Sequence, residues 1–404
     1  MSNPTDPFLG VNTLDPAFRA DPYPALAHLR AAHPVHEVAP LGLWRLSRYA
    51  DCTRLLRDAP VGVRLSNGTR LGEDRLPPAM QGFGNFMLQQ DPPTHTRLRR
   101  LVSKAFTPRA VERLRAHVQA FADSLVDRAL ERGELDAIAD LALPVPSTVI
   151  CELMGVPLAD RDRFTQWTAH ATHLLAAFAA APEVLERGVA ASQSLAEYFT
   201  VLVAERRGSD RDDLLSNLIR AEEAGDRLSP EELLSQSIGL LIAGFETTIG
   251  LIGNGLLALV RHPDELRKLR ANPGLIASAV EECLRFDGPI LLTVRIPREE
   301  LRFGDQVIPK DRLVMALLGS ANRDPEVFPD PERFDIARTP NEHMAFGGGT
   351  HFCLGAHLAR MEAQAAIGAL VRRTAEIELM SEELVWGQSL FRVLGELPLR
   401  VKPA

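Results

Sequence analysis

The sequence predicts a mainly α-helical fold with a small β region, an α+β protein with one long helix at its centre. Apolar residues recur at three- and four-residue steps along most of the chain, as they do in amphipathic helices. One apolar run, residues 238–260, is too continuous for a surface helix and therefore predicts a central one. Strand patterns are few, and they fall near residues 35–47 and 292–318. We expect one domain spanning residues 1–404.

Two helices can be placed by local signals. The first covers residues 109–132, where Gly133 ends the pattern of apolar residues Val111, Leu114, Val118, Phe121 and Leu125. The second begins at Ser229, followed by Pro230 at the first helical position and by Glu232 for a capping box. We expect it to end before residues 262–263, as one continuous helix of roughly thirty residues that crosses the whole domain.

The strand signals form three groups. The runs VHEVAP and GLWRLS, near residues 35–47, predict a hairpin, and LTVRIP, LRFGDQVIP and RLVMALL, between residues 292 and 318, predict a second group. The tail, LFRVLGELPLRV, predicts a further pair of strands.

Composition and charge limit the function. With 46% hydrophobic and 24% charged residues, the 404-residue chain is ordinary for a globular protein. Its net charge of −8 gives no reason to expect nucleic acid as a partner. The N-terminus lacks the basic and apolar segments of a signal peptide, and the run 238–260 carries Glu246, which would be costly in lipid. We therefore expect a cytoplasmic protein without a membrane anchor.

The residues that indicate chemistry are concentrated in FGGGTHFCLG, residues 346–355. Glycines let backbone N–H groups turn inward, and a helix is predicted directly after Cys353, with its positive end toward the sulfur. A single thiolate so arranged suits a metal whose other positions are filled by a cofactor, and haem meets that description. A buried cysteine after a glycine-rich turn is the alternative. The isolated Cys52, Cys151 and Cys283 are expected to be small buried hydrophobes.

The loop resembles the haem-binding loop of the cytochrome P-450 superfamily, of the soluble bacterial haem-thiolate monooxygenase type. The family pattern F-G-x-G-x-H-x-C-x-G is matched in full by Phe346, Gly347, Gly349, His351, Cys353 and Gly355. The resemblance implies the P-450 fold, with its long central helix over the haem, and haem b (iron protoporphyrin IX) as cofactor. It makes Cys353 the iron ligand, and it assigns cofactor contacts to Phe346, Gly347, His351 and Gly355.

A second motif, Ala243-Gly244-Phe245-Glu246-Thr247-Thr248, resembles the family's oxygen-activation signature. On the residues alone, Gly244 removes a side chain where a ligand could approach the backbone, and Glu246 with Thr247 forms an acid–alcohol pair that can relay protons. A helix kink with satisfied polar groups is the alternative. The resemblance makes Glu246 and Thr247 catalytic and brings Ala243 and Gly244 to the cofactor. The intact pair favours dioxygen with delivered electrons over peroxide.

Two further sets of residues follow from the resemblance. The first is an E-x-x-R motif with a downstream P-x-R-F, which implies a buried ion network supporting the cysteine loop: Glu282, Arg285 and Arg333. The second would bind the haem propionates, although each of its members alone is more often a surface charge: His95, Arg99, Arg295 and His351.

The implied reaction inserts one oxygen atom from O2 into a lipophilic small molecule, by C–H hydroxylation or epoxidation. No flavin, nicotinamide or iron–sulfur motif is found, so a ferredoxin with its reductase would deliver electrons that come ultimately from NAD(P)H. We expect a monomer. Candidate docking residues, equally explained as a solvated helix face, are Arg97, Arg100 and Lys104. The alternative functions are a non-catalytic haem sensor or carrier, and a purely structural helical protein without haem.

Substrate identity is the least constrained. Apolar candidates for the pocket, each of which can equally be plain core, are Phe83, Phe86, Met87, Ala243, Leu291, Leu292 and Phe391. They suit a fatty acid, terpenoid or polyketide. Three arginines in the segment from about residue 60 to 90 either bind a carboxylate of the substrate or are solvated loop charges: Arg64, Arg70 and Arg75.

Overall fold

The computed structural model describes residues 8–12, 15–77, 84–104, 106, 108–176, 180–211, 213–223, 228–387 and 389–404. Its α-helices are α1 Pro16–Ala20, α2 Tyr23–Ala32, α3 Tyr49–Arg57, α4 Thr94–Ser103, α5 Pro108–Arg132, α6 Pro144–Leu153, α7 Arg161–Ala171, α8 Pro182–Arg206, α9 Leu214–Glu223, α10 Pro230–Gly244, α11 Glu246–Arg261, α12 Pro263–Ala271, α13 Ile276–Asp287, α14 Leu318–Ala321 and α15 Ala356–Arg373. Short helical turns are η1 Ala39–Leu41, η2 Glu73–Arg75, η4 Met87–Gln89, η5 Ile138–Ala142, η6 Leu158–Asp160, η7 Thr172–Ala176, η8 Pro273–Leu275 and η9 Gly349–His351.

The strands form three small sheets. They are β1 Val35–Val38, β2 Leu43–Leu46, β3 Val61–Gly62, β4 Glu134–Asp136, β5 Thr293–Pro297, β6 Leu301–Phe303, β7 Gln306–Ile308, β8 Leu313–Ala316, β9 Thr374–Leu379 and β10 Pro398–Pro403. The largest sheet has the order β1-β2-β8-β5-β3, with β2 and β8 parallel and its other pairs antiparallel. The hairpin at 35–47 and the strand group at 292–318 are both where the sequence predicts them.

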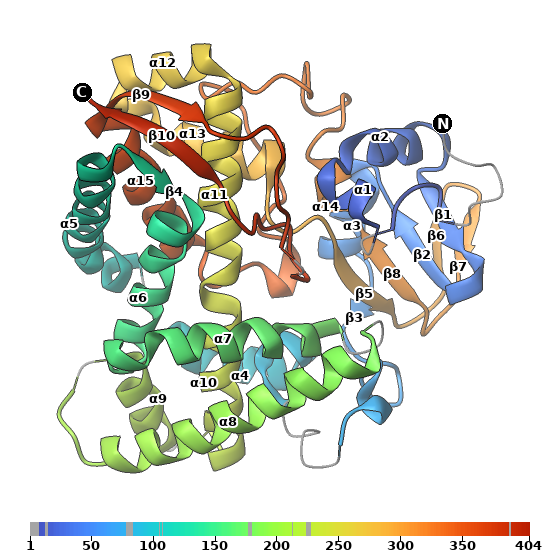
Figure 1. Ribbon diagram of the computed structural model, residues 1–404. Helices are drawn as coiled ribbons and strands as arrows, with labels where there is room; N and C mark the ends of the chain where they lie inside the picture. Colours follow the sequence, from blue (N-terminus) through green and yellow to red (C-terminus); the bar gives the residue numbers. More distant parts are fainter. Residues whose placement is uncertain are drawn as a thin grey trace.

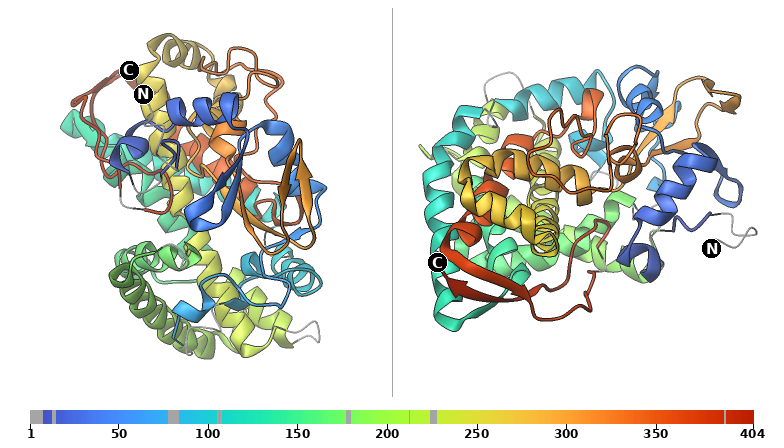
Figure 2. Two further views of the ribbon diagram at one scale, coloured as in Figure 1. Left: turned by 90° about the vertical axis from the view of Figure 1, so that its right-hand side faces the viewer. Right: turned by 90° about the horizontal axis from the view of Figure 1, so that it is seen from above.

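The largest sheet lies apart from most of the helices. This sheet, which contains β1, β2, β5 and β8, lies with α1, α2, α3 and α14 on one side of the molecule, and the other helices gather along the line of α10 and α11, with β4, β9 and β10 among them (Figure 1). The turned views show the same division (Figure 2). The largest buried apolar cluster runs through the helices, and α11 packs against α13 and α15. The expectation of a mainly α-helical fold is therefore confirmed.

The long central helix begins as expected. The Ser229 hydroxyl accepts a hydrogen bond from the Glu232 N–H (3.2 Å), the Glu232 carboxylate accepts one from the Ser229 N–H (2.9 Å), and Pro230 is at the first helical position. By length and hydropathy the stretch Pro230–Arg261 could cross a membrane, but 78% of its most apolar window is buried inside the protein. It is therefore built as a core helix.

The long central helix is confirmed, with one interruption: the chain leaves helical geometry at Phe245 (φ −130°, ψ −36°). The two parts, α10 and α11, continue one another along a common line (Figure 1). Two residues after the break, the Thr247 hydroxyl reaches the Ala243 carbonyl at 3.4 Å. A side chain that takes up a backbone carbonyl in this way is a known cause of helix distortion.

The tail also differs from its prediction. Residues 390–401 do not pair as two strands; instead β10 pairs with β9 on one side and with β4 on the other. An isolated bridge, between Trp386 and Leu394, joins two parts of the tail. The helix at 109–132 is confirmed, and Gly133 ends it with φ +73°. Cys52, Cys151 and Cys283 are buried, as expected.

Candidate active site

The glycine-rich loop folds tightly onto α3 before it reaches Cys353. Gly347 and Gly349 both have left-handed backbones (φ +71° and +65°), which glycine adopts without strain. A Cβ on Gly349 would lie 2.0 Å from the Leu56 carbonyl oxygen, so this position accepts only glycine without moving the backbone. The Cys353 N–H donates to the Phe346 carbonyl at 3.0 Å and closes the loop.

Cys353 is a free, half-buried thiol immediately before α15, where the sequence predicts a helix. Burial raises the pKa of the thiol, and the Gly355 amide and the guanidinium groups of Arg99 and Arg360 oppose that shift. The surroundings therefore contain the donors and positive charge that favour a thiolate once a metal replaces the proton. The loop is built to present one sulfur ligand.

Four nitrogen-bearing side chains gather beside this loop. The rings of His95, on α4, and His351, in η9, lie 4.3 Å apart between centroids. Burial together with repulsion from Arg295, His95 and Arg99 lowers the pKa of His351 to about 3. Burial also lowers the pKa of Arg295, on β5, to about 10. The structure thus brings all four predicted propionate partners together.

The same four residues fit the haem expected from the sequence. His95 Nδ1 is buried and has no hydrogen-bond partner within the described ranges. Arg99 is half-buried. Burial lowers the pKa of its guanidinium, and the charge of the nearby Cys353 opposes that shift. Since repulsion between like charges is a main cause of the low pKa of His351, the cluster suits an anionic group with two carboxylates.

The helix break opens a face of the central helix. Ala243 is exposed although it lies in the middle of a core helix, and Gly244 is half-buried. A Cβ on Gly244 would lie 2.9 Å from Ile150 Cδ1, so this glycine lets α6 pack against α10. The glycine is thus required by helix packing, in addition to any approach of a ligand to the backbone.

Glu246 and Thr247 lie directly after the break. Glu246 is buried, and its Oε2 makes no hydrogen bond to any described residue. Burial raises the pKa of this carboxyl, and the hydroxyls of Ser389 and Thr172 oppose the shift. A carboxyl in such a setting can hold a proton at neutral pH, beside the alcohol of Thr247.

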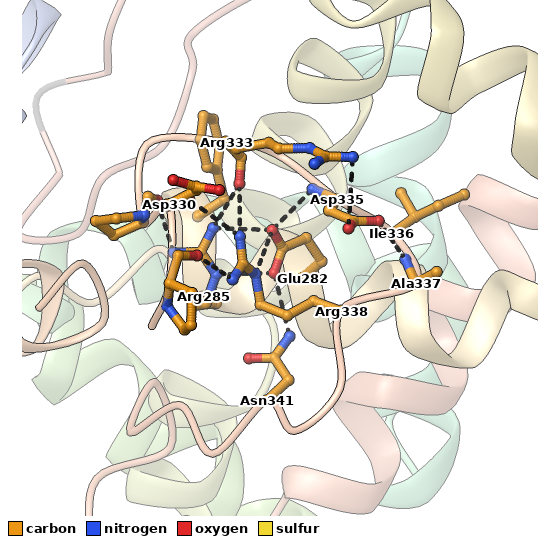
Figure 3. A network of polar contacts seen from close by, with 12 residues as sticks. Glu282, Arg285, Asp330, Arg333, Asp335, Ile336, Ala337, Arg338 and Asn341 are labelled. Atoms are coloured by element: carbon orange, nitrogen blue, oxygen red, sulfur yellow. Dashed lines mark hydrogen bonds and ion pairs between the residues drawn. The ribbon is translucent and has the colours of Figure 1, made fainter. Parts of the chain in front are cut away.

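The E-x-x-R motif forms a fully buried ion pair. Arg285 Nε and Nη2 donate to the two carboxylate oxygens of Glu282, both at 2.8 Å. Arg285 also donates to the backbone carbonyls of Asn322, Pro331 and Arg333, at 2.9 to 3.0 Å. The pair therefore ties α13 to the loop that precedes the cysteine (Figure 3).

The prediction that the Arg333 side chain is the third member of this ion network is wrong. Its side chain is 64% exposed, and its guanidinium lies 3.8 Å from the Asp335 carboxylate. Arg338 fills the place instead: its side chain is 10% exposed, and its Nε donates to Glu282 Oε1 at 3.3 Å (Figure 3). The physical reason is that Arg333 contributes its backbone carbonyl to Arg285, which leaves its side chain directed at solvent.

Sequence reasoning missed a second brace of the cysteine loop. Arg360, on α15, donates to both oxygens of Glu281 at 2.6 and 2.8 Å, and His343 contacts the same carboxylate at 3.0 Å. Burial alone would raise the pKa of Glu281, but these hydrogen bonds outweigh it and lower the pKa to about 2. Arg360 also stacks over the Phe346 ring, 4.4 Å from its centroid. Charged residues on two separate helices carry no spacing signal that would reveal this contact.

A buried carboxyl, Glu362, was also missed. It lies on α15, is 1% exposed, and neither oxygen has a hydrogen-bond partner in the described parts of the chain. Burial raises its pKa well above the usual value, and the Thr248 hydroxyl opposes the shift. Its only sequence signal is a lone acid within an apolar helical stretch.

The substrate candidates lie in varied places. Phe83 is outside the described residues. Phe86 packs across Gly239 of α10, and Met87 is buried. Leu291 lies against Gly319. The half-buried remainder, Leu292 and Phe391, pack against different apolar clusters. The assignment of these residues and of Ala243 as substrate contacts stays a prediction.

The candidate docking residues Arg97 and Arg100 lie on α4, and Lys104 follows directly after it. Arg97 forms an ion pair with Glu232 at the start of α10, and this contact occupies part of its guanidinium. Arg100 and Lys104 are exposed on the surface.

The comparisons with known proteins agree with this geometry. The sequence profile of the family named Cytochrome P450 matches residues 76–273 and 274–382. Cytochrome P450 107B1 of Saccharopolyspora erythraea is 43% identical over 398 residues, which cover 96% of each chain. The cytochrome P450 monooxygenase PikC of Streptomyces venezuelae is 43% identical over 404 residues, which cover 98% of this chain and 94% of that protein. The crystal structure of the myxobacterial cytochrome P450 CYP267B1 with myristic acid has a TM-score of 0.85 at 41% identity, over 96% of this chain and 97% of that one.

Proposed function

This chain belongs to the cytochrome P450 family, and from that premise we propose that it inserts one oxygen atom from O2 into a lipophilic small molecule. Membership makes the chain an oxidoreductase of the monooxygenase type with a haem-thiolate cofactor. The proposal adds C–H hydroxylation or epoxidation as the reaction. It also adds a separate ferredoxin with its reductase as the source of electrons, drawn ultimately from NAD(P)H.

The observation that carries the proposal is the cluster formed by His95, Arg99, Arg295 and His351. Burial lowers the pKa of all four side chains, and repulsion from the arginines lowers those of the two histidines further. Arg99 is also in electrostatic contact with the Cys353 thiol. In the proposed enzyme, Cys353 ligates the haem iron, and the cluster holds the propionates: His95, Arg99, Arg295 and His351. Phe346, Gly347 and Gly355 shape the loop on the sulfur side, and Ala243 and Gly244 face the cofactor from the helix break.

Haem supplies the iron at which dioxygen is activated, and the protein supplies the ligand, the protons and the shape of the site. Glu246 is the proposed proton source, because burial raises the pKa of its carboxyl and one of its oxygens has no hydrogen-bond partner in the described structure. Thr247 is the proposed relay: its hydroxyl is 3.4 Å from the Ala243 carbonyl and can exchange that contact for one to a proton acceptor.

Glu282 and Arg285 have a proposed structural role. Through Arg285 their buried pair connects α13 to the backbone carbonyls of Asn322, Pro331 and Arg333. It holds the segment that leads to Cys353 and takes no part in the chemistry. Arg338 replaces Arg333 as the second arginine of this brace.

The setting of the enzyme completes the proposal. Apolar candidate residues support a fatty acid, terpenoid or polyketide-like substrate, and CYP267B1 was solved with myristic acid. We propose a cytoplasmic monomer in which residues 1–404 form one domain. The exposed basic residues Arg100, on α4, and Lys104, directly after it, support electrostatic docking of an acidic ferredoxin.

The test is turnover with a surrogate ferredoxin, its reductase, NADPH and isotopically labelled dioxygen. Myristic acid and panels of terpenoids and macrolides are the substrates, and mass spectrometry measures the product. A product that carries one labelled oxygen atom supports the proposal. A protein that binds haem through its thiolate and receives electrons, yet oxygenates none of these compounds, would instead be a sensor or carrier.

A further inference from the structure

Three arginines lie in the segment 60–90, and the structure gives them different surroundings. Arg64 uses its whole guanidinium on backbone carbonyls, those of Gln89, Gly68 and Gly84, at 2.8 to 2.9 Å. Arg75 is at the surface and donates to the Ala180 carbonyl at 2.7 Å. Arg64 therefore has a structural role, because it joins these loop carbonyls, and Arg75 is bonded to the backbone of a surface segment.

Arg70 is different because it is only 9% exposed and incompletely bonded. Its Nη1 donates to the Gln89 side-chain oxygen, but its Nη2 is buried and has no hydrogen-bond partner in the described chain. Glu73 accepts the backbone N–H of Arg70 at 2.9 Å through its Oε2. A buried charged donor without an acceptor is costly, and an anionic ligand would remove that cost.

The position of Arg70 links it to the proposed haem site. Its partner Gln89 belongs to η4, whose first residue, Met87, donates its N–H to Gln236 of α10 at 3.1 Å. Phe86, next to it, packs against Gly239 of the same helix. Arg70 is therefore connected through Gln89 to a segment whose apolar side chain Phe86 packs against the central helix.

The C-terminal end of the segment 84–91 contacts the cluster formed by His95, Arg99, Arg295 and His351. Asp91, two residues after Gln89, accepts the His95 N–H through its carbonyl at 3.0 Å and forms an ion pair with Arg298 at the end of β5. Asp91 also opposes the lowering of the pKa of Arg295 by burial. Arg70 is thus connected through one short segment to the residues proposed to hold the propionates.

We propose that Arg70 binds the carboxylate of the substrate, with Gln89 holding the guanidinium in place, and that the substrate is a lipophilic monocarboxylic acid of the fatty-acid type. This inference rests on the proposed function and narrows its substrate class from lipophilic compounds in general. One nitrogen of this guanidinium is bonded to an amide oxygen and another is buried without a partner in the described chain, so a carboxylate oxygen would supply the missing acceptor. The neutral terpenoids and polyketides are then disfavoured.

The experiment compares saturated C12 to C16 fatty acids with the primary alcohols of equal length, by calorimetric and absorbance titration of the haem-loaded protein. Wild-type protein should bind each acid at least about 10-fold more tightly than its alcohol, since hydrogen bonds to charged groups are worth roughly 10- to 100-fold in affinity. Arg70→Met should abolish this preference by weakening acid binding more than alcohol binding, and Arg70→Lys should restore part of it. Arg75→Met is the matched control and should behave as wild type.

Equal binding of acids and alcohols by the wild-type protein overturns the inference, with no variant needed. An acid preference that survives in Arg70→Met overturns it as well. The thiolate-type spectrum of the reduced, carbon monoxide-treated protein is recorded on every sample. A normal spectrum without acid preference therefore refutes the role of Arg70 alone, whereas a missing spectrum refutes the proposed function.

Discussion

Arg338 and Arg333 offer a sharp test, because the sequence motif and the structure disagree about which arginine stabilises the cysteine loop. Arg338→Ala removes a charge-assisted hydrogen bond to the buried Glu282 carboxylate, worth about 1.5–3 kcal/mol. It also removes hydrogen bonds to three backbone carbonyls, those of Pro329, Asp330 and Arg333. The Asp330 carbonyl keeps the Arg333 N–H as a donor, and the Arg333 carbonyl keeps Arg285. Water reaches these carbonyls, so they add little, and Glu282 keeps Arg285. We expect a total loss of about 2–4 kcal/mol.

Arg333→Ala is the matched control. Its side chain is 64% exposed and lies 3.8 Å from Asp335, a type of contact worth about 0–1 kcal/mol, and its carbonyl bond to Arg285 survives the substitution. The assay is urea denaturation of both haem-loaded variants, followed by circular dichroism and haem absorbance. Equal losses in the two variants, or a larger loss in Arg333→Ala, would refute the assignment.

Three further predictions test the site. Gly349→Ala should destabilise haem binding far more than Gly347→Ala in thermal melts: both have positive φ, worth about 1–2 kcal/mol, but only the first brings a Cβ to 2.0 Å from the Leu56 carbonyl. The pKa of Glu281 is about 2 in the folded protein against 4.5 for the free group, so its carboxylate stabilises the fold above about pH 4.5 and loses that effect as pH falls toward 2. Glu281→Gln should lower the free energy of unfolding by about 2 kcal/mol at neutral pH. It should also make stability less dependent on pH between about 4.5 and 2, as measured by acid denaturation. Glu246→Gln should lower product formed per NADPH roughly 100-fold; wild-type turnover should fall as pH rises through the raised pKa of Glu246, and a variant with full coupling would contradict the proton role.

Local signals explain what the sequence predicts well. The capping box at Ser229, the stop at Gly133 and the helix directly after Cys353 each depend on neighbours within a few residues, and all three are found in the structure. The hairpin near residues 35–47 is predictable for the same reason, since its strands are joined by a short turn. The left-handed backbones of Gly347 and Gly349 agree with the dense glycines of the loop.

Features that depend on distant contacts escape the sequence. The break at Phe245 interrupts a run with excellent helix composition, next to a glycine where α6 packs. The strand β4 has only three residues and is defined by its partner β10, which is more than 250 residues away in the chain. Spacing alone could not separate Arg333 from Arg338, because both lie in one loop and only packing decides which side chain turns inward.

Buried polar groups are the other gap. Glu281, Glu362 and Arg70 look like ordinary charged residues on a helix or in a loop, and nothing in their neighbours reveals that they are partly or fully buried. Burial follows from how separate elements pack, so only the structure shows that Arg70 retains an open donor while Arg64 does not.

The account depends most on Cys353 as a thiolate ligand of haem iron. The most direct measurement is the absorption spectrum of the purified protein after reduction and exposure to carbon monoxide, recorded beside Cys353→Ala. The account predicts the strongly red-shifted Soret band of thiolate-ligated ferrous haem in the wild-type protein and its loss in the variant. No haem after expression with ample haem supply, or a red-shifted band that persists in Cys353→Ala, would contradict it.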